Sequence, residues 1–478
     1  MKNRTLFFKV SLIGLAVATP LIAGCSRIRA WEERRAYGNY QAAVASGDIV
    51  RTKFALAALV RVDEDVPDYW AELGRVEVQL GEYGKAYDAY SRAYELDRSN
   101  VQILAALTQL ALTSGHVDMA NQHARSLALL APDNPAVTLV RSYMAFQSND
   151  LDNADTLVDK LLADSPTDSN AKVLKAHVLI ARGRIDDAIA LLEKQRQAVP
   201  KDQSALRGLV ALYRSRDDWR NVARVQLELH KLDPKNTNVA ALLLEALLRT
   251  GDLANARRVS GPLLSPAADP LTVEATLLSW AKYAPPGVAL PDAPQLAEAS
   301  TGERRVAFAN YYNRIGKPAA AGALLGSPQL PVNPANARLN AVIAQSIALQ
   351  GRLAEAKQLF DQVLRAEPDQ PDALRGRSAL AAKTGSTRQA IIDAQRLVSS
   401  RPDTSEDRLL LARAFLAAGN RKEVARTLWQ AFQDMPDDER IVAALRSVLV
   451  STGDLDGERR LTDEFEDKRK AKLTKELV

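Results

Sequence analysis

The sequence predicts an all-α protein, an α-solenoid of about twelve helix-turn-helix repeats with a degenerate central joint. Two in-phase series of residues predict it. The first is a series of prolines spaced 34 residues apart within each run, at Pro132, Pro166, Pro200 and Pro234 and again at Pro368, Pro402 and Pro436. The second is a series of glycines seventeen residues before the proline position. A constant period of this length, ending in a residue that stops helices, is typical of stacked helical units.

The glycine series marks the turn inside each predicted helix pair. A helix end often needs a positive φ, which glycine adopts without steric cost. Two in-phase positions hold Asn149 and Asp217 instead, the next most tolerant residue types, so we expect both to be left-handed. The glycines are Gly81, Gly115, Gly183, Gly251, Gly351, Gly385, Gly419 and Gly453.

Residues 67–100 show the repeat pattern most fully. The residues that carry it are Trp70, Leu73, Gly74, Gly81, Tyr83, Ala86, Tyr90 and Ala93. This pattern resembles the tetratricopeptide repeat, and the resemblance extends along nearly all of the mature chain. It departs at Glu77 and Arg98, where the family usually has tyrosine and proline. The resemblance implies a right-handed superhelix with the first helix of each unit on the concave face.

Composition along the chain predicts the domain organisation. Proline and glycine are frequent between residues 271 and 336, and prolines interrupt helices, so we expect degenerate repeats there. The predicted segments are a signal peptide at 1–24, a tether at 25–32, an N-terminal arm at 33–270, the degenerate repeats at 271–336, and a C-terminal arm with a charged capping helix at 337–478.

The N-terminus has the charge order of a secretory signal. Three basic residues precede an uncharged apolar run, Val10–Ala23, which is short for a membrane-spanning helix. The run ends next to Cys25, the only cysteine in the chain. Residues 22–25 resemble the bacterial lipobox, which implies lipidation of Cys25, removal of residues 1–24 and, with Ser26 following, the periplasmic face of a Gram-negative outer membrane. A plain signal peptide and an uncleaved anchor are the alternatives.

The net charge of the mature chain argues against a nucleic-acid partner. The signal peptide holds three of the 63 basic residues and none of the 58 acidic ones, so the mature chain is nearly neutral. We therefore expect no nucleic-acid partner. The arginines at positions 27, 29, 34 and 35 could meet anionic lipid head groups, although Glu32 and Glu33 interrupt the run and favour a solvated helix face.

No catalytic, metal or cofactor site is predicted. Of the four histidines, only His116 and His123 are close in sequence, and neither has a cysteine or an acidic cluster beside it. Phosphate-binding glycine loops, zinc-helix motifs and serine elbows do not occur in the sequence. The chain is therefore predicted not to be an enzyme.

Candidate partner-binding residues follow from the resemblance, which places certain positions of each first helix on the concave face. The candidate partner-binding residues are Tyr143, Phe146, His177, Arg207, Arg214, Arg249, Arg375, Lys383 and Arg413. Other residues at such positions are Glu245, Arg338, Gln345 and Glu406. Basic residues outnumber acidic ones, so an acidic peptide segment or an anionic polysaccharide could bind there. A generic solvated surface is the alternative.

The predicted function is a non-enzymatic periplasmic scaffold, tethered to the outer membrane by Cys25, that binds proteins of an envelope secretion machine. The chain most resembles lipoproteins of exopolysaccharide export. A pilus or secretin assembly lipoprotein, or a regulatory module for an envelope enzyme acting on peptidoglycan or proteins, is the alternative. The partner's identity and the oligomeric state do not follow from the sequence.

Overall fold

The computed structural model describes residues 15–476, with side chains from Ala30 to Lys472 apart from Lys470. The predicted signal peptide therefore lies partly outside the described residues, and the Cys25 side chain lies wholly outside them. Within them the all-α prediction is confirmed, since they contain 26 helices and no strand. None of these helices combines the length and apolarity that crossing a bilayer requires.

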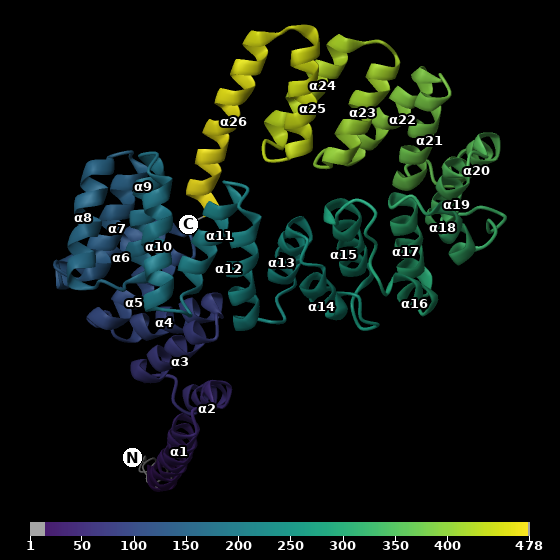
Figure 1. Cartoon of the computed structure of the whole chain (residues 1–478). Helices are drawn as coiled ribbons and strands as arrows, with labels where there is room; N and C mark the ends of the chain where they lie inside the picture. The colour runs from purple at the N-terminus through teal and green to yellow at the C-terminus, as the bar shows by residue number, and fades with distance from the viewer. Residues whose placement is uncertain (1–14, 477–478) are drawn as a thin grey trace, which may run out of the picture. The chain divides into compact units, whose positions relative to one another are not determined.

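The chain divides into two compact units, with the boundary after Val178 (Figure 1). The first contains α1 (Leu15–Ala45), α2 (Ile49–Val62), α3 (Pro67–Gln79), α4 (Tyr83–Leu96), α5 (Val101–Thr113), α6 (Val117–Leu130), α7 (Pro135–Gln147) and α8 (Leu151–Asp164). Helix α9 (Ser169–Ala181) crosses the boundary. The predicted joint between arms is at 271–336, so these units do not coincide with the predicted arms, whose division stays a prediction.

The second unit is the larger, and its helices again follow one another in pairs. They are α10 (Ile185–Ala198), α11 (Gln203–Arg214), α12 (Trp219–Leu232), α13 (Thr237–Thr250), α14 (Leu253–Leu263), α15 (Pro270–Tyr283), α16 (Ala293–Glu298), α17 (Gly302–Arg314), α18 (Pro318–Leu325), α19 (Ala337–Leu349), α20 (Leu353–Ala366), α21 (Pro371–Lys383), α22 (Thr387–Ser400), α23 (Ser405–Ala417), α24 (Arg421–Asp434), α25 (Glu439–Thr452) and α26 (Leu455–Glu476).

The turns inside the helix pairs are left-handed, as predicted. Every glycine of the predicted series has φ between 72° and 88°. Asn149 has φ 61° and Asp217 has φ 55°, and no other non-glycine residue of the described chain has a positive φ. The geometry lets the residue after the turn bond back to the helix that ends there. The Asp150 N–H, for example, donates to the Ala145 carbonyl at 2.8 Å, which satisfies one of the unpaired carbonyls at the end of α7.

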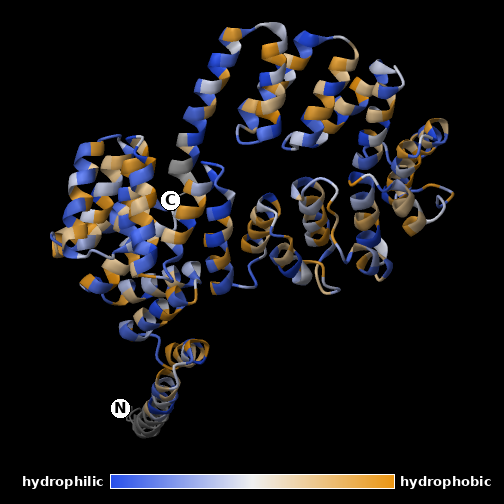
Figure 2. Ribbon diagram, in the orientation of Figure 1, coloured by the Kyte–Doolittle hydropathy of each residue, from blue (hydrophilic) through white to orange (hydrophobic). Residues whose placement is uncertain are grey.

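Small residues on the second helices hold the pairs together. One alanine in each of seven second helices is completely buried, and these are Ala86, Ala120, Ala154, Ala188, Ala256, Ala356 and Ala390. A side chain of this size lets two helices approach closely, while leucine and valine beside it fill the space between successive pairs. Figure 2 shows the resulting division of many helices into hydrophobic and hydrophilic sides.

The proline-rich stretch at 271–336 retains two first helices and loses much of its second helices. Helices α15 and α17 have 14 and 13 residues, whereas α16 and α18 have only 6 and 8. Helix α15 ends where Ala284 precedes Pro285 and is extended, with ψ 146°. A residue before proline avoids the helical conformation because the proline ring would clash with it, so the sequence itself ends this helix.

Tertiary contacts keep this stretch packed. Leu290 is 3% exposed, and its N–H donates to the Tyr311 hydroxyl oxygen at 2.7 Å. The Arg304 guanidinium donates to three backbone carbonyls just after α14, those of Leu264, Ser265 and Ala268. Side chains therefore compensate for the backbone hydrogen bonds that the prolines remove.

Candidate functional site

Three predicted aromatic and histidine side chains form a cluster in the first unit. The ring centroids of Tyr143 and Phe146 are 6.5 Å apart, and those of Phe146 and His177 are 5.6 Å apart. Tyr143 and His177 are both buried, and burial raises the pKa of the Tyr143 hydroxyl. Phe146 is only half-buried. Most of this cluster therefore packs inside the protein, and Phe146 offers the surface that a partner could contact.

Three of the candidate arginines, Arg207, Arg214 and Arg249, do not all line one cavity. Arg214 and Arg249 line a cavity of about 440 Å³ in the second unit, together with Trp219 and Tyr283. Arg207 is exposed outside it and bonds to the Gln203 side chain one helical turn away, at 3.1 Å. The register of α11 explains this difference, because residues seven apart on a helix are also displaced along its axis by about 10 Å.

Two aromatic rings and two carboxylates surround the Arg249 guanidinium. Its guanidinium carbon lies 4.1 Å from the ring centroid of Trp219 and 4.6 Å from that of Tyr283. It also forms ion pairs with Glu245 at 3.0 Å and with Glu439 at 3.4 Å. A guanidinium between two aromatic faces and two carboxylates is largely satisfied within the protein. Arg249 therefore stabilises the local structure and is a poor candidate for binding a partner.

A second cavity, of about 330 Å³, gathers more of the predicted residues. We name it the α17–α23 groove, and it is lined by Asn310, Arg314, Gln345, Ala348, Leu349, Leu353, Phe360, Asp372, Arg375, Gly376, Ala379, Leu380, Lys383, Glu406, Leu410 and Arg413. All three candidates predicted in the C-terminal arm, Arg375, Lys383 and Arg413, belong to it. The prediction did not name Arg314 or Asn310, because their unit lies in the degenerate stretch where the repeat is hardest to align.

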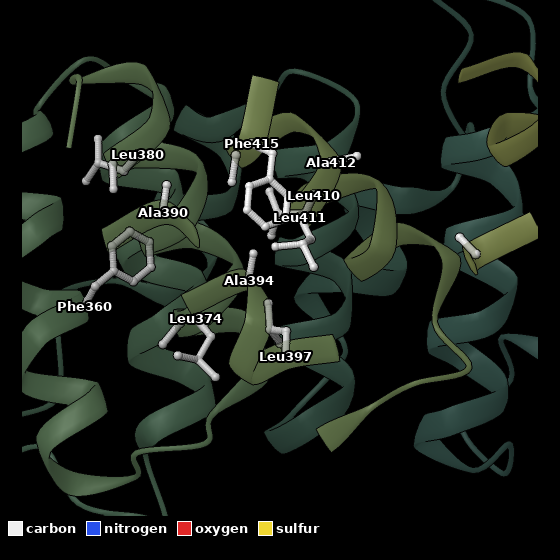
Figure 3. Packing of buried hydrophobic residues seen from close by; sticks show 14 of the residues in the cluster. Phe360, Leu374, Leu380, Ala390, Ala394, Leu397, Leu410, Leu411, Ala412 and Phe415 are labelled. Carbon is white, nitrogen blue, oxygen red and sulfur yellow. The ribbon is translucent and has the colours of Figure 1, made fainter. Parts of the chain in front are cut away.

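The floor of the groove is apolar and tightly packed. Phe360 is fully buried among α20–α23, where Figure 3 shows it with Leu374, Leu380 and other side chains of the core. Gly376 of α21 lies directly against the Phe360 ring, and an added Cβ would be 2.6 Å from its Cε1 atom. Glycine is required at this point because the ring occupies the space that a side chain would need.

Two of the cations in the groove are neutralised by neighbouring acids. Arg375 pairs with the fully buried Asp407 at 2.8 Å and with Asp372 at 3.1 Å. Arg314 pairs with Glu406 through both of its terminal nitrogens, at 2.8 and 3.2 Å, although the two residues are 92 positions apart. Burial acts to raise the pKa of Glu406, but the hydrogen bond from Arg314 and the positive charges of Arg314 and neighbouring arginines together outweigh burial and lower the pKa. These two arginines therefore hold the helices of the groove in place.

The other two cations remain available. Lys383 and Arg413 are exposed, and neither forms an ion pair in the part of the chain that the structure describes. Leu349, which lines the same groove, is 53% exposed. Free cations next to an open apolar surface suit a chain segment that carries both carboxylates and aliphatic side chains. The α17–α23 groove is therefore the candidate partner-binding site.

The described residues contain no cluster of metal-binding side chains. Among them no three histidine, cysteine, aspartate or glutamate side chains form a group that could hold a metal ion. His123 is hydrogen-bonded to the Tyr87 hydroxyl at 3.1 Å, and His116 precedes α6 at its N-cap. Both histidines thus have structural positions.

Family profiles match three parts of the chain. One, described as "Tetratricopeptide repeat", matches residues 37–101 and 343–405. Another, described as "Psidin, N-terminal TPR repeats region", matches residues 139–265. The matched segments include parts of both compact units, and the groove helices α20 and α21, with the C-terminal half of α19, lie within the second tetratricopeptide match.

Two curated proteins show sequence similarity. The "Cellulose synthase 2 operon protein C" of Komagataeibacter xylinus is 28% identical over 327 residues, covering 63% of this chain and 22% of that protein. The "Cellulose synthase operon protein C" of Xanthomonas axonopodis is 35% identical over 114 residues, covering 23% of this chain and 8% of that protein. The chain thus matches less than a quarter of the length of either relative.

Solved structures of repeat proteins are similar over part of the chain. A tetratricopeptide repeat protein from Parabacteroides merdae is 18% identical, with a TM-score of 0.34, and the match covers 52% of this chain and 99% of that one. The Pseudomonas aeruginosa pilF protein is also 18% identical, with a TM-score of 0.29 and coverage of 44% and 95%.

Proposed function

Since this chain belongs to the tetratricopeptide-repeat family, we propose that it is a non-enzymatic scaffold lipoprotein that binds protein partners of an exopolysaccharide export machine. Proteins of this family bind partners on the surface of the helical array, because the repeats supply a long surface and no catalytic loops. The proposed location is the periplasmic face of the outer membrane, with attachment through Cys25.

The observation that carries the proposal is the chemistry of the α17–α23 groove. Lys383 and Arg413 supply two free positive charges, while Leu349 supplies an exposed apolar contact. An acidic peptide segment with aliphatic side chains satisfies both features at once. An anionic polysaccharide would satisfy only the charges and would leave Leu349 without an apolar contact, so we favour a protein partner.

The link to exopolysaccharide export rests on the relatives. Two curated proteins with significant similarity are both named for the operon of cellulose synthase, an enzyme whose product is a polysaccharide. Because the matches cover only 22% and 8% of those proteins, we carry over the pathway class and no individual activity.

The location rests on the sequence. Cys25 follows an apolar run with basic residues before it, and a diacylated cysteine would hold the protein at a membrane without a spanning helix. Cys25→Ala is therefore expected to move the protein from the outer-membrane fraction to the soluble periplasm. Retention of Cys25→Ala in that fraction after a high-salt wash would reject the anchor.

The groove is tested by charge reversal in cells that lack the gene. Lys383→Glu with Arg413→Glu is expected to reduce secreted polysaccharide several-fold, while the protein level and circular dichroism spectrum stay unchanged. The matched control is Arg388→Glu with Lys422→Glu, two exposed cations without ion pairs on the second helices α22 and α24. Equal secretion by both double variants would show that the groove does not bind the partner. Normal secretion in the deletion strain itself would reject the export function.

A further inference from the structure

The second unit closes on itself through its last helix. Helix α26 contacts α11, more than two hundred residues earlier in the chain, and Figure 1 shows its C-terminal part beside that helix. The Arg469 side chain donates to the Asp217 carboxylate at 3.3 Å across a separation of 252 residues. A second bridge joins Arg249 of α13 to Glu439 at the start of α25, 190 residues later. The last helix pair thus returns to the beginning of the unit.

The contact with Arg469 explains why the α11–α12 turn has Asp217 in place of glycine. Asp217 is one of the two residues that replace glycine in the turn series, and it adopts the left-handed conformation at φ 55°. A glycine would take this conformation more easily. It would have no carboxylate to receive Arg469, however, so the aspartate both makes the turn and anchors α26.

Apolar packing attaches α26 to its own end of the unit. Leu461 is fully buried in the cluster formed by α19–α26, and Phe465 packs partly against that cluster. The two bridges, Arg469–Asp217 and Arg249–Glu439, are ion pairs with exposed carboxylates. Asp217 is 57% and Glu439 is 54% exposed. Exposed ion pairs are weak and are screened by salt, whereas buried apolar contacts are not. The closure is therefore the weaker of the two attachments.

The closure borders the partner groove. The Arg440 side chain, next to Glu439, donates to the Ser405 hydroxyl oxygen at 2.6 Å. Ser405 precedes Glu406, which lines the α17–α23 groove and pairs there with Arg314. The start of α25, which lines the cavity near α11–α15, therefore lies next to the α17–α23 groove.

We propose that α26 is an electrostatic strap: its contact with Asp217, supported by the Arg249–Glu439 pair, closes the second unit and restricts entry of long acidic segments to the α17–α23 groove. The inference about entry rests on the proposed function of the groove, whereas the closure itself does not.

The closure is tested by electron–electron resonance distances between two nitroxide labels. The chain from residue 25 onward, carrying Cys25→Ser, is labelled at Arg220→Cys on α12 and Ala471→Cys on α26, both exposed positions. At low salt we expect one narrow distance distribution. Salt at about 1 M reduces the screening length to about 3 Å and should add a longer, broader population. A broad distribution already present at low salt would overturn the strap.

A pair of variants on the same helix separates the strap from a general charge effect. Arg469→Glu is expected to increase the long-distance population several-fold. The control, Arg459→Glu, makes the same change at a residue that is 78% exposed and pairs only with Asp456 within α26, so it should leave the distances unchanged. Identical distance distributions for the two variants would show that Arg469 does not hold the closure.

Entry to the groove is measured separately, with a fluorescein-labelled oligoglutamate peptide. Arg469→Glu should bind this probe several-fold more tightly than the unmutated chain, even though the variant adds negative charge, whereas Arg459→Glu should bind it no more tightly. A larger long-distance population in Arg469→Glu without tighter binding of the oligoglutamate peptide would overturn the proposal that the closure restricts entry to the groove. Failure of every variant to bind the probe would reject the acidic-segment groove, and the distance measurements would still decide the closure.

Discussion

Gly376 provides a quantitative test of the packing beneath the groove. Replacement of a glycine by alanine in a helix interior normally stabilises the helix by about 1 kcal/mol, because alanine loses less backbone entropy on folding. Gly376 lies in the interior of α21, so sequence reasoning alone predicts stabilisation by Gly376→Ala. The structure predicts the opposite result, since the Phe360 ring occupies the position of the new methyl group.

The magnitude follows from the geometry of this contact. The new Cβ would lie 2.6 Å from Phe360 Cε1, well inside the ordinary contact range, and still closer to Cζ. The ring is fully buried and has no exposed direction in which to move. Overpacking of this kind costs about 1–3 kcal/mol, and the severity of the contact places it near 3. After the helix-propensity gain of about 1 kcal/mol, we expect Gly376→Ala to destabilise the protein by about 2 kcal/mol.

Urea unfolding followed by circular dichroism measures the effect, with hydrogen exchange of α20 and α21 to locate it. Gly38→Ala is the control, because Gly38 lies inside α1 with no atom near its Cβ position, and it should be neutral or stabilising. In a Phe360→Leu background the shorter side chain should relieve the contact and convert Gly376→Ala from destabilising to neutral or stabilising. Equal stabilisation by Gly376→Ala in both backgrounds would refute the reasoning, since it would mean that the ring does not fill this space.

The left-handed turn at Asn149, with φ 61°, predicts that Asn149→Gly keeps or raises stability, whereas Asn149→Val lowers it by about 1–2 kcal/mol in urea titrations. Equal stability of these two variants would contradict the assigned conformation. Asp438 predicts a pH dependence: burial acts to raise its pKa, but hydrogen bonds from Arg440 and Ser405 together with the positive charge of Arg440 outweigh burial and lower the pKa to about 2. Its contribution is therefore complete above the unfolded pKa of about 4 and is lost as the pH falls towards 2. Thermal unfolding of Asp438→Asn should show a smaller loss between these pH values than the unmodified chain, and identical profiles would exclude the ion pair as its cause.

Much of the fold could be predicted because residues within a single repeat determine most of that repeat's structure. The glycine at each turn, the alanine on each second helix and the proline at the end act within one unit, through backbone conformation and close helix contact. Asn149 and Asp217 were predictable from the same rule, as the least costly substitutes at a positive φ. The packing around Leu290 and of the segment just after α14 was not, since these depend on Tyr311 and Arg304 respectively, which come later in the chain.

The sequence named some of the residues that line the α17–α23 groove but not their pairing. The resemblance placed Arg375, Lys383 and Arg413 on the concave face, and all three line one groove, whose role in binding stays a prediction. It did not distinguish the paired arginine from the free cations. Arg375 is neutralised by Asp407, which belongs to the next repeat, whereas Lys383 and Arg413 have no such acid within reach in the described chain. In the first unit, Tyr143 was expected to be accessible and is buried.

By itself the sequence determined the repeat, its turns, the faces that its helices bury, and the apolar segment that precedes Cys25. These are set by residues within about one period of one another, where backbone sterics and helical spacing leave few alternatives. Only the tertiary structure decided which charges remain free and where α26 ends. Ion pairs such as Arg314–Glu406 and Arg469–Asp217 join residues 92 and 252 positions apart. The superhelix sets the distances between such residues, and no local pattern specifies them.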